Sequence, residues 1–365
     1  MRIIYNAVTS NSIIRGVDRY NIEILYRFDK INRAGECFVI YGPWQKYYPL
    51  KDTRNIKFIC KKIPHSQLLR NFWQAFIFPF FTRRLKPDLV HLSNTMPLFF
   101  KFYPTIVTIP DVLEDEEKTF HLFQRIYRRY MVKRICKYAE IVITISNYIA
   151  SLIYKRFPRD KIEVVYLSTF KRDITEKEGN LNLPDKYLLF VGTIDPHKNI
   201  LRLTQAYFEF LKQNDGNLSF VIVGAYGRDY EKFNNLINAS EYKSRIYYYT
   251  DVSNAQLLEI YKKAFMVVFP SITEGFGLPI LEAMGEGVPV ITSNTASMPE
   301  VAGDAAILVD PYSTDQITAA INDLYNDKEL RNKLIKKGYE RIKLFSWDKT
   351  AEKIFKLYCE LKLKK

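Results

Sequence analysis

Short apolar runs alternate with longer amphipathic segments along the first half of the chain. The short runs are rich in Ile, Val, Leu and Tyr and favour β-strands, while the longer segments carry apolar residues every three to four positions, as helices do. The expected strands are Arg2–Asn6, Phe38–Tyr41, Ile56–Ile59, Leu89–Leu92, Thr105–Ile109, Ile141–Ile145 and Glu163–Tyr166. The expected helices include Gly16–Lys30, Gln67–Lys86, His121–Tyr138 and Asn147–Phe157. Strands that are apolar throughout are covered on both faces, so the pattern predicts a parallel sheet with helices on either side.

The second half of the chain repeats this alternation after a polar stretch. Residues 171–185, KRDITEKEGNLNLPD, are charged and offer little to bury, which is typical of a linker. The strands expected beyond it are Tyr187–Val191, Ser219–Val223, Ile246–Tyr249, Met266–Phe269, Val288–Thr292 and Ala306–Val309, and the last helices are Ser313–Asn326 and Lys328–Leu344. Two such halves predict an α/β chain of two doubly wound, Rossmann-like parallel-sheet domains. Ligands of such sheets bind at the carboxyl ends of the strands, so we expect the two domains to face a cleft that holds the site.

The composition excludes several classes of protein. The chain has 365 residues, of which 47% are hydrophobic and 26% charged, as in ordinary globular proteins. No apolar run reaches the roughly 18 residues of a membrane-spanning helix, and Met1–Asn6 has the pattern of a strand, not of a signal peptide. The four cysteines include no Cys-x-x-Cys pair, which indicates the reducing cytoplasm. The sequence also lacks an Asp-x-Asp pair and any His and Cys cluster with metal-ligand spacing, so we expect neither a metal nor a cofactor.

The net charge of +14 is unevenly distributed. Residues 1–175 hold 30 Lys and Arg against 15 Asp and Glu, whereas residues 176–365 hold 24 against 25. A basic half predicts an anionic partner, which can be a nucleic acid, an anionic membrane surface or a phosphorylated substrate. We expect no nucleic acid, because no helix-turn-helix, zinc-finger, RRM or KH pattern is present.

Two expected helices concentrate the charge of the first half. At about 100° per residue, one side of His121–Tyr138 is apolar and comprises Phe123, Tyr127, Met131, Ile135 and Tyr138. The opposite side comprises Arg125, Arg128, Arg129, Lys133 and Lys137. We expect this basic side to bind an anionic membrane surface. Gln67–Lys86 adds bulky aromatic residues between basic ends; most of them should cover the sheet, and a part should reach lipid.

The segment from Phe269 to Met284, FPSITEGFGLPILEAM, has the layout of an anion-binding turn. A buried strand ends at Phe269, Gly275 and Gly277 permit a tight loop, and Pro279 suits the first turn of a helix. Backbone amides at the start of that helix should point toward an anion such as a phosphate. These amides belong to Phe276, Gly277 and Leu278.

Two glutamates flank this turn, Glu274 on the loop and Glu282 in the helix that follows. Their carboxylates can accept hydrogen bonds from a ribose diol and from the hydroxyls of the group that the phosphate carries. The spacing resembles the Glu-x7-Glu motif of retaining glycosyltransferases with the GT-B fold, in particular the large family four group. The resemblance covers nearly the whole chain. Its further segments are Val191–Asn199 (VGTIDPHKN), Val221–Gly224, Pro87–His91, Thr144–Ser146 and Phe345–Trp347.

The resemblance implies a domain layout. Residues 1–170 would bind the acceptor, 171–186 would form the linker, 187–345 would bind the nucleotide sugar, and 346–365 would form a helix that crosses back to the first domain. Lys198 would contact the diphosphate as a point charge, Glu282 would bind the ribose and Glu274 the hydroxyls of the donor sugar. The other donor-binding residues would be Gly16, which approaches the diphosphate, Thr193, His197, Val252 near the base, Gly275, Phe276, Gly277 and Leu278.

Two features depart from the family pattern. Thr193 and His197 stand where relatives carry an arginine or a second basic residue, so the phosphate site should be less charged than usual unless His197 is protonated. Pro110 stands where relatives have a histidine that contacts the donor sugar. Asp111, which follows it, is retained and joins Lys198 and Glu274 as a candidate for catalysis.

These observations predict a retaining hexosyltransferase, peripheral on the inner face of the cytoplasmic membrane. We expect it to transfer a sugar, with mannose from GDP-mannose as the favoured donor, to a lipid-linked glycan in surface polysaccharide or lipopolysaccharide biosynthesis. The resemblance implies a front-face displacement, which leaves most of the catalysis to electrostatic stabilisation of the leaving diphosphate. The alternatives are a GT-B epimerase and a non-catalytic protein that binds sugar nucleotides or nucleic acid, to which Pro110 lends weight.

Overall fold

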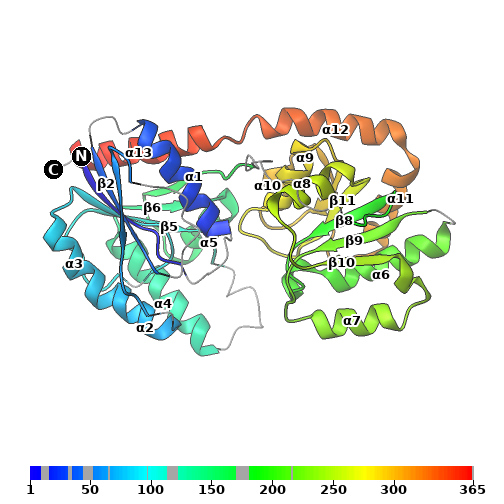
Figure 1. The fold of residues 1–365 in the computed structure, drawn as a ribbon, viewed down its shortest axis with the longest axis horizontal. Coiled ribbons are helices and arrows are strands. Elements are labelled where there is room, and N and C mark those ends of the chain that lie inside the picture. Colours follow the sequence, from blue (N-terminus) through cyan, green and yellow to red (C-terminus); the bar gives the residue numbers. More distant parts are fainter. Residues whose placement is uncertain are drawn as a thin grey trace. The chain divides into compact units, whose positions relative to one another are not determined.

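The computed structural model describes residues 1–9, 16–31, 35–43, 52–64, 66–96, 98–112, 122–169, 181–214 and 217–363. Most of the expected linker lies outside this described part. The chain forms two compact units, one of Met1–Leu167 with Ser346–Lys365 and one of Ser168–Phe345. Each unit is built on its own parallel sheet (Figure 1). The predicted fold class, two doubly wound parallel-sheet domains, is therefore confirmed.

The first unit has a seven-stranded parallel sheet in the order β3-β2-β1-β4-β5-β6-β7. Its strands are β1 (Arg2–Asn6), β2 (Glu36–Tyr41), β3 (Ile56–Cys60), β4 (Leu89–Leu92), β5 (Thr105–Ile109), β6 (Ile141–Thr144) and β7 (Ile162–Val164). Its helices are α1 (Gly16–Ile31), α2 (Gln67–Phe72), η1 (Trp73–Ile77), α3 (Phe78–Leu85), α4 (Leu122–Tyr138), α5 (Asn147–Arg156) and α13 (Trp347–Leu363).

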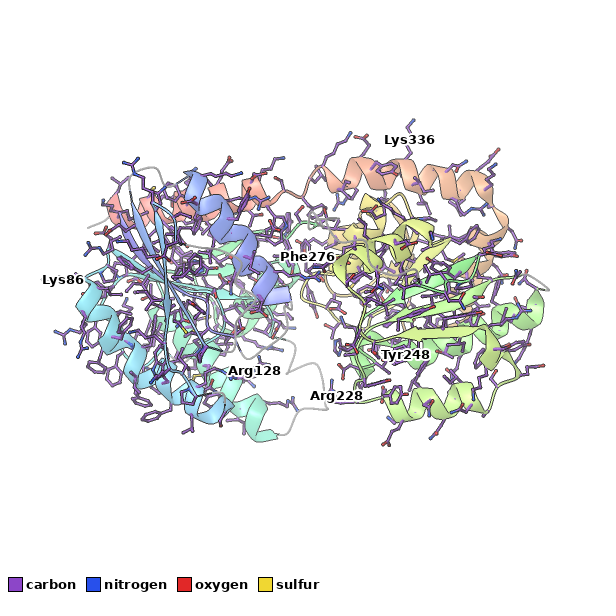
Figure 2. All side chains as sticks on the ribbon, viewed as in Figure 1. Lys86, Arg128, Arg228, Tyr248, Phe276 and Lys336 are labelled. Carbon is purple, nitrogen blue, oxygen red and sulfur yellow. The ribbon has the colours of Figure 1, made fainter. Side chains whose placement is uncertain are left out.

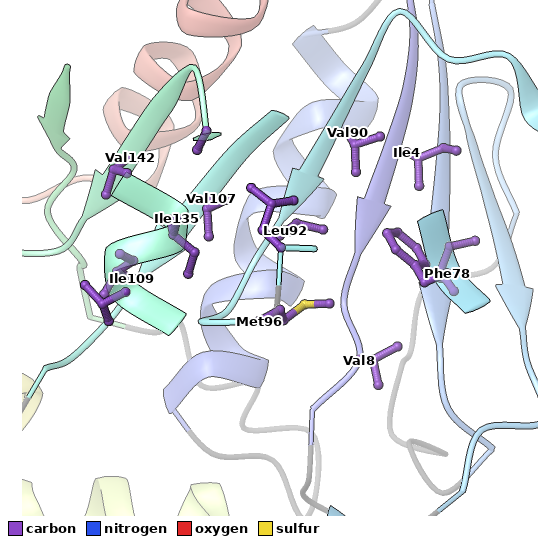
Figure 3. Packing of buried hydrophobic residues seen from close by; sticks show 14 of the residues in the cluster. Ile4, Val8, Phe78, Val90, Leu92, Met96, Val107, Ile109, Ile135 and Val142 are labelled. Atoms are coloured by element: carbon purple, nitrogen blue, oxygen red, sulfur yellow. The ribbon is translucent and has the colours of Figure 1, made fainter. Parts of the chain in front are cut away.

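Helices cover both faces of this sheet, which explains why its central strands β4, β5 and β6 are buried along their whole length. Helices α1 and α13 lie side by side on one face (Figure 1). There the Tyr358 hydroxyl lies 2.5 Å from Nδ1 of the buried His91 on β4. On the other face, α3 and α4 pack against the strands in a core that includes Phe78, Ile135 and Leu92 (Figure 3).

The expected helix Gln67–Lys86 contains a turn of π-helix, η1, that the sequence pattern did not predict. The Phe78 amide donates to the Trp73 carbonyl, five residues back. Pro79 accounts for this turn, because a proline in a regular helix collides with the carbonyl four residues earlier. Within this segment Trp73 faces the core, whereas Phe72 and Phe76 are 55% and 40% exposed.

Helix α4 matches its predicted sides only in part. Met131 and Ile135 are buried, as expected of the apolar side. Tyr138, predicted on the same side, is 37% exposed. It is the last residue of the helix, and its ring lies under the Arg134 guanidinium at 4.8 Å instead of in the core. The side chain of Phe123 lies outside the described part of the chain.

The second unit has a six-stranded parallel sheet in the order β10-β9-β8-β11-β12-β13. Its strands are β8 (Tyr187–Val191), β9 (Ser219–Val223), β10 (Ile246–Tyr249), β11 (Met266–Phe269), β12 (Val290–Ser293) and β13 (Ala306–Val309). Its helices are η3 (Pro196–Lys198), α6 (Ile200–Gln213), α7 (Tyr230–Asn238), η4 (Glu241–Arg245), α8 (Asn254–Lys263), α9 (Leu278–Gly285), α10 (Met298–Ala302), α11 (Thr314–Asn326) and α12 (Lys328–Ile342). Among the helices described in both units, none has the length and apolarity that crossing a bilayer requires.

Candidate active site

Four loops leave the second sheet along one edge. Strands β10, β9, β8 and β11 are parallel neighbours, so their carboxyl ends lie side by side. The loops that follow them carry Val252, residues 224–229, residues 192–199 and residues 270–277. The fold therefore brings most of the expected donor-binding residues to one edge. They are Thr193, His197, Lys198, Val252, Glu274, Gly275, Phe276, Gly277 and Leu278.

The loops after β8 and β9 pack backbone against backbone. A Cβ atom at Gly224 would lie 1.9 Å from the carbonyl oxygen of Gly192, and one at Gly227 would lie 2.3 Å from that of Ile194. Both distances are far below van der Waals contact, so only glycine fits at these two positions. This packing fixes the conformation of the loop that leads into η3. It thereby fixes the backbone position of Lys198, the last residue of η3.

Lys198 and Glu274 form an ion pair across two of these loops. The Lys198 Nζ atom lies 2.6 Å from Oε1 of Glu274, and the side chains are only 16% and 13% exposed. The same Nζ atom lies 5.2 Å from the centroid of the Phe269 ring. Asn199 ends η3 in the left-handed conformation, and its side-chain amide donates to the Pro270 carbonyl at 3.0 Å. The two loops are thus joined by a neutral hydrogen bond and by a charged one.

Glu282, the second glutamate of the motif, lies in the second half of α9 and is 8% exposed. The Tyr261 hydroxyl, from α8, donates to its Oε2 atom at 2.8 Å. This bond orients the carboxylate from the protein side. The two glutamates therefore have different neighbours, a lysine for Glu274 and a phenol for Glu282.

The start of α9 has the predicted turn. Gly277 precedes the helix with a φ of 107°, a conformation that favours glycine. The Ser297 hydroxyl donates to the carbonyls of Glu274 and Phe276, at 2.9 Å each, and holds the loop in place. The Phe276 ring (Figure 2) is buried and packs edge-on against Phe345, with ring centroids 5.9 Å apart. The Phe276 side chain is therefore packed inside the second unit.

A second cation lies on the neighbouring loop. The Arg228 side chain (Figure 2) donates through Nε to Oδ1 of Asp195 at 2.9 Å and is 43% exposed. Thr193 donates to Oδ2 of the same carboxylate at 2.8 Å. Burial raises the pKa of Asp195, but the hydrogen bonds from Arg228 and Thr193 outweigh it and leave that pKa below its usual value. Asp195 is therefore ionised at neutral pH and joins the loops after β8 and β9.

The first unit carries two further expected site residues. Gly16 is the exposed first residue of α1, and a Cβ atom there would meet nothing within 4 Å. The fold itself therefore does not require a glycine at this position. Asp111 follows β5, and its Oδ1 atom lies 3.9 Å from Nη2 of Arg128, with both side chains 41% exposed.

The basic side of α4 faces both a recess and solvent. Arg125, Arg128 and Arg129 line a recess together with Arg156 of α5 and the apolar side chains around Val132. Lys133 and Lys137, farther along α4, are exposed. All five residues predicted to bind an anionic surface are thus at least partly accessible. Among the residues that the structure describes, no group of three or more His, Cys, Asp and Glu could hold a metal ion.

Two family models match consecutive parts of the chain. One is described as "Glycosyltransferase Family 4" and matches residues 14–168. The other is described as "Glycosyl transferases group 1" and matches residues 171–341, so that together the two span most of the chain. The chain belongs to glycosyltransferase family 4. This confirms the family that the motifs around Glu274 and Glu282 predicted.

The curated relatives of this glycosyltransferase include enzymes of O-antigen synthesis. It is 27% identical to O-antigen chain mannosyltransferase B of Escherichia coli over 98% of its own length and 99% of that protein. It is 33% identical to O-antigen chain mannosyltransferase RfbU of Salmonella typhimurium over 55% of each chain.

Solved structures of proteins with low sequence identity to this chain share its fold. Sucrose-phosphate synthase from Thermosynechococcus elongatus superimposes with a TM-score of 0.80 at 18% identity, with both chains fully covered. WaaG, a glycosyltransferase involved in lipopolysaccharide biosynthesis, does so with a TM-score of 0.75 at 15% identity, over 96% of this chain and 98% of WaaG. At these identities the likeness shows the GT-B fold and nothing finer.

Sequence reasoning missed several residues of the site. It assigned Lys198 and Glu274 to different parts of a ligand but did not foresee that they pair, because they are 76 positions apart. Tyr261 and Arg228 were not singled out either. An aromatic residue in an amphipathic helix and an arginine in a loop have no local pattern that would mark them. Only the sheet order, which makes β9 the neighbour of β8, could have pointed to Arg228.

Proposed function

We propose that this glycosyltransferase transfers mannose from GDP-mannose to a lipid-linked glycan, with retention of the anomeric configuration. The choice of mannose is supported by the Escherichia coli relative, a mannosyltransferase that matches over nearly its whole length. A polysaccharide acceptor is supported by the same relative and by RfbU, both of which are O-antigen chain enzymes.

The observation that carries the proposal is the Lys198 and Glu274 pair beside the start of α9. A nucleotide sugar presents a diphosphate and a ring of hydroxyls within a few ångströms of each other. The pair offers a cation for the former and a carboxylate for the latter, and α9 adds the positive end of its dipole. Glu282, oriented by Tyr261, is the acceptor for the ribose hydroxyls.

The chemistry follows from this charge distribution. The bond between the anomeric carbon and the diphosphate oxygen breaks while the acceptor hydroxyl attacks the same face of the sugar. The hydroxyl proton passes to the leaving diphosphate. Lys198 and the amides at the start of α9 stabilise the charge that develops on that diphosphate, so the barrier falls without a metal ion. Glu274 holds the sugar hydroxyls, and Asp111 of the first unit is the further candidate for catalysis.

The first unit would bind the acceptor and the membrane that carries it. The arginines around the α4 recess, Arg125, Arg128 and Arg129, suit the phosphate of a lipid-linked glycan or of a lipid headgroup, because guanidinium groups pair with phosphate oxygens. Lys133 and Lys137 would add attraction to an anionic leaflet. Such an enzyme would work at the cytoplasmic face of the membrane.

The proposal is tested by donor turnover. Purified protein is incubated with GDP-mannose, GDP-fucose, UDP-glucose or UDP-galactose, and release of the nucleoside diphosphate is measured with and without a lipid-linked glycan. We expect release from GDP-mannose above all, and loss of release in Lys198→Ala. NMR of the glycan product should show the anomeric configuration of the donor. Binding of GDP-mannose without any release or transfer would instead favour the non-catalytic alternative.

A further inference from the structure

We propose that the first unit docks on an anionic lipid bilayer through exposed apolar side chains of the α2–η1–α3 segment and of the loop before β5. We call this surface the aromatic face. It comprises Leu69, Phe72, Phe76, Ile77, Phe80, Phe100 and Phe102, each of which is 40–57% exposed. The inference rests on the proposed function in one respect, since it names the surface by which the enzyme would reach a lipid-linked acceptor.

The aromatic face is contiguous. The Phe76 ring lies 4.9 Å from that of Phe72 and 5.9 Å from that of Phe100, measured between centroids. The Phe80 ring lies 5.3 Å from Phe100 and 5.2 Å from Phe102. Two segments of the chain therefore form one apolar surface. Around the π-helical turn, Phe72 and Phe76 are exposed while Trp73 is buried.

Helix α4 continues this surface. Phe99 stacks on Phe76 at 5.5 Å and lies 6.5 Å from Tyr130 of α4, which is 45% exposed. Ile126 and Tyr138, also on α4, are 58% and 37% exposed. The helix that carries the basic residues therefore borders the aromatic face directly.

An apolar recess opens beside the aromatic face. It lies between α3 and the loop before β5 and is lined by Phe78, Pro79, Leu98, Phe100 and Phe102, among others. Exposed apolar patches of this kind usually mark an interaction site, because water is a poor solvent for them. The recess therefore adds apolar surface next to the aromatic face.

The charge around the aromatic face indicates what covers it. Residues 67–86, 98–103 and 122–138 hold eleven Lys and Arg and no Asp or Glu. Arg83 lies over the Phe102 ring at 4.9 Å and Arg134 over the Phe99 ring at 4.9 Å, so cations border the aromatic rings. Lys86 lies at the end of α3, and Arg128 on α4 (Figure 2).

Bulky side chains without hydrogen-bonding groups, bordered mainly by cations, suit the interface of an anionic bilayer. The rings would enter the region between headgroups and acyl chains, and the cations would meet the phosphates. Arg70 is buried and Lys101 is paired with Glu140, so these two add little to the surface charge. A protein partner would have to neutralise the remaining cations, whereas a leaflet of anionic lipid does so with its headgroups.

The first experiment is co-sedimentation with vesicles of phosphatidylglycerol and phosphatidylcholine, and with vesicles of phosphatidylcholine alone. The aromatic variant carries Phe72→Ser, Phe76→Ser and Phe80→Ser. A matched control carries Tyr26→Ser and Leu363→Ser, which remove exposed side chains (50% and 86%) from the helices on the opposite face of the sheet. We expect the partition coefficient on anionic vesicles to fall about tenfold or more in the aromatic variant and to stay unchanged in the control.

Salt separates the two contributions. At about 0.5 M NaCl, exposed charges are screened within a few ångströms. Binding of the wild-type protein should weaken there, and the remainder should depend on the phenylalanines. Equal sedimentation of the aromatic variant and the wild type would overturn the proposal. So would self-association of the wild type, seen by analytical ultracentrifugation, that the aromatic variant abolishes without any vesicle binding in either protein.

A second variant tests insertion without removing an aromatic ring. Phe76→Trp should be quenched by brominated phospholipids beyond the background of the native tryptophans, whereas Tyr26→Trp should show only that background. No extra quenching in Phe76→Trp would mean that the aromatic face does not enter the bilayer. Release of GDP from GDP-mannose by the wild type in vesicle-free buffer is measured alongside. Failure of the proposed function would appear there, separately from the vesicle results.

Discussion

At the scale of single residues, the two glutamates of the motif differ in what they touch. Glu274 is paired with Lys198, and Glu282 is buried against the Tyr261 hydroxyl. We predict that Glu282→Ala weakens binding of GDP itself by about 10-fold to 100-fold, since a hydrogen bond to a charged group contributes about 1.5–3 kcal/mol. Glu274→Gln should leave GDP affinity within about twofold and lower turnover of GDP-mannose instead. Isothermal titration calorimetry and donor release measure the two effects.

A control is needed because Glu282→Ala also leaves a buried phenol without its acceptor. That alone costs about 1–3 kcal/mol of folding stability. Tyr261→Phe removes only the hydroxyl group and keeps the Glu282 carboxylate, so this variant should retain GDP binding better than Glu282→Ala does. If both glutamate variants lost GDP affinity equally, the assignment of one to the ribose and the other to the sugar would be wrong.

Gly224 and Gly16 differ in whether the packing of the chain requires a glycine at that position. Gly224→Ala would place a Cβ atom 1.9 Å from the Gly192 carbonyl oxygen, and the backbone must move to avoid it. We predict a loss of about 1–3 kcal/mol in folding stability, together with loss of GDP binding as the loop before Lys198 shifts. Chemical denaturation and titration with GDP check this prediction.

Gly16→Ala is the counterpart in the first unit. A Cβ atom there would meet nothing within 4 Å, so the folding stability should not fall. If the backbone at Gly16 approaches the donor diphosphate, as the family resemblance implies, turnover should nevertheless drop. A variant with unchanged melting temperature and unchanged turnover would remove Gly16 from the donor site.

At the scale of elements, one buried histidine helps to hold α13 on the first sheet. His91 lies between the Tyr358 hydroxyl of α13, at 2.5 Å, and the Thr108 hydroxyl of β5, at 2.8 Å. Burial lowers the pKa of His91 from 6.5 to about 3. The imidazole is therefore neutral in the folded protein at physiological pH.

This pKa makes stability depend on pH. Below about pH 6.5, His91 binds a proton in the unfolded chain but not in the folded chain. The free energy of unfolding therefore decreases as the pH falls from 6.5 toward 3. Between pH 7 and pH 5 the loss should be about 2 kcal/mol. His91→Gln should lose correspondingly less over this interval, where most carboxylates remain ionised. Urea unfolding at both pH values measures the difference, and equal losses in the two proteins would contradict the prediction.

The limits of strands were easier to predict than irregular helical turns and contacts between loops. The limits of β1, β5 and β11 match the expected ranges residue for residue, because an apolar run in a parallel sheet is a local signal. The π-helical turn before Pro79 was missed, since it arises from a collision along the helix and not from periodicity. The pairing of Lys198 with Glu274 was missed because it joins loops that only the sheet order brings together.

At the scale of the whole molecule, charge is divided between the two halves of the chain. Residues 1–175 carry a twofold excess of Lys and Arg over Asp and Glu, while residues 176–365 are nearly balanced. The nearly balanced half contains the loops that carry Lys198 and Glu274. Because its net charge is small, the electrostatic potential at these loops depends on the few charged side chains nearby. The basic half bears the aromatic face and the α4 arginines. This division suits an enzyme that takes a small anionic donor on one unit and an extended anionic surface on the other.

The last prediction concerns how the donor diphosphate is neutralised. Lys198, with its Nζ atom beside Glu274, and the positive end of α9 lie at the same edge of the second sheet, and Arg228 adds a cation on the neighbouring loop. If these groups stabilise the leaving diphosphate, turnover of GDP-mannose should survive EDTA with a change of less than about twofold, while Lys198→Ala should lower it about 100-fold or more. Initial rates of GDP release, measured with EDTA and again after adding magnesium or manganese, check this. Activity that disappears with the chelator and returns with either ion would mean that a divalent cation, and not Lys198, carries the charge of the leaving group.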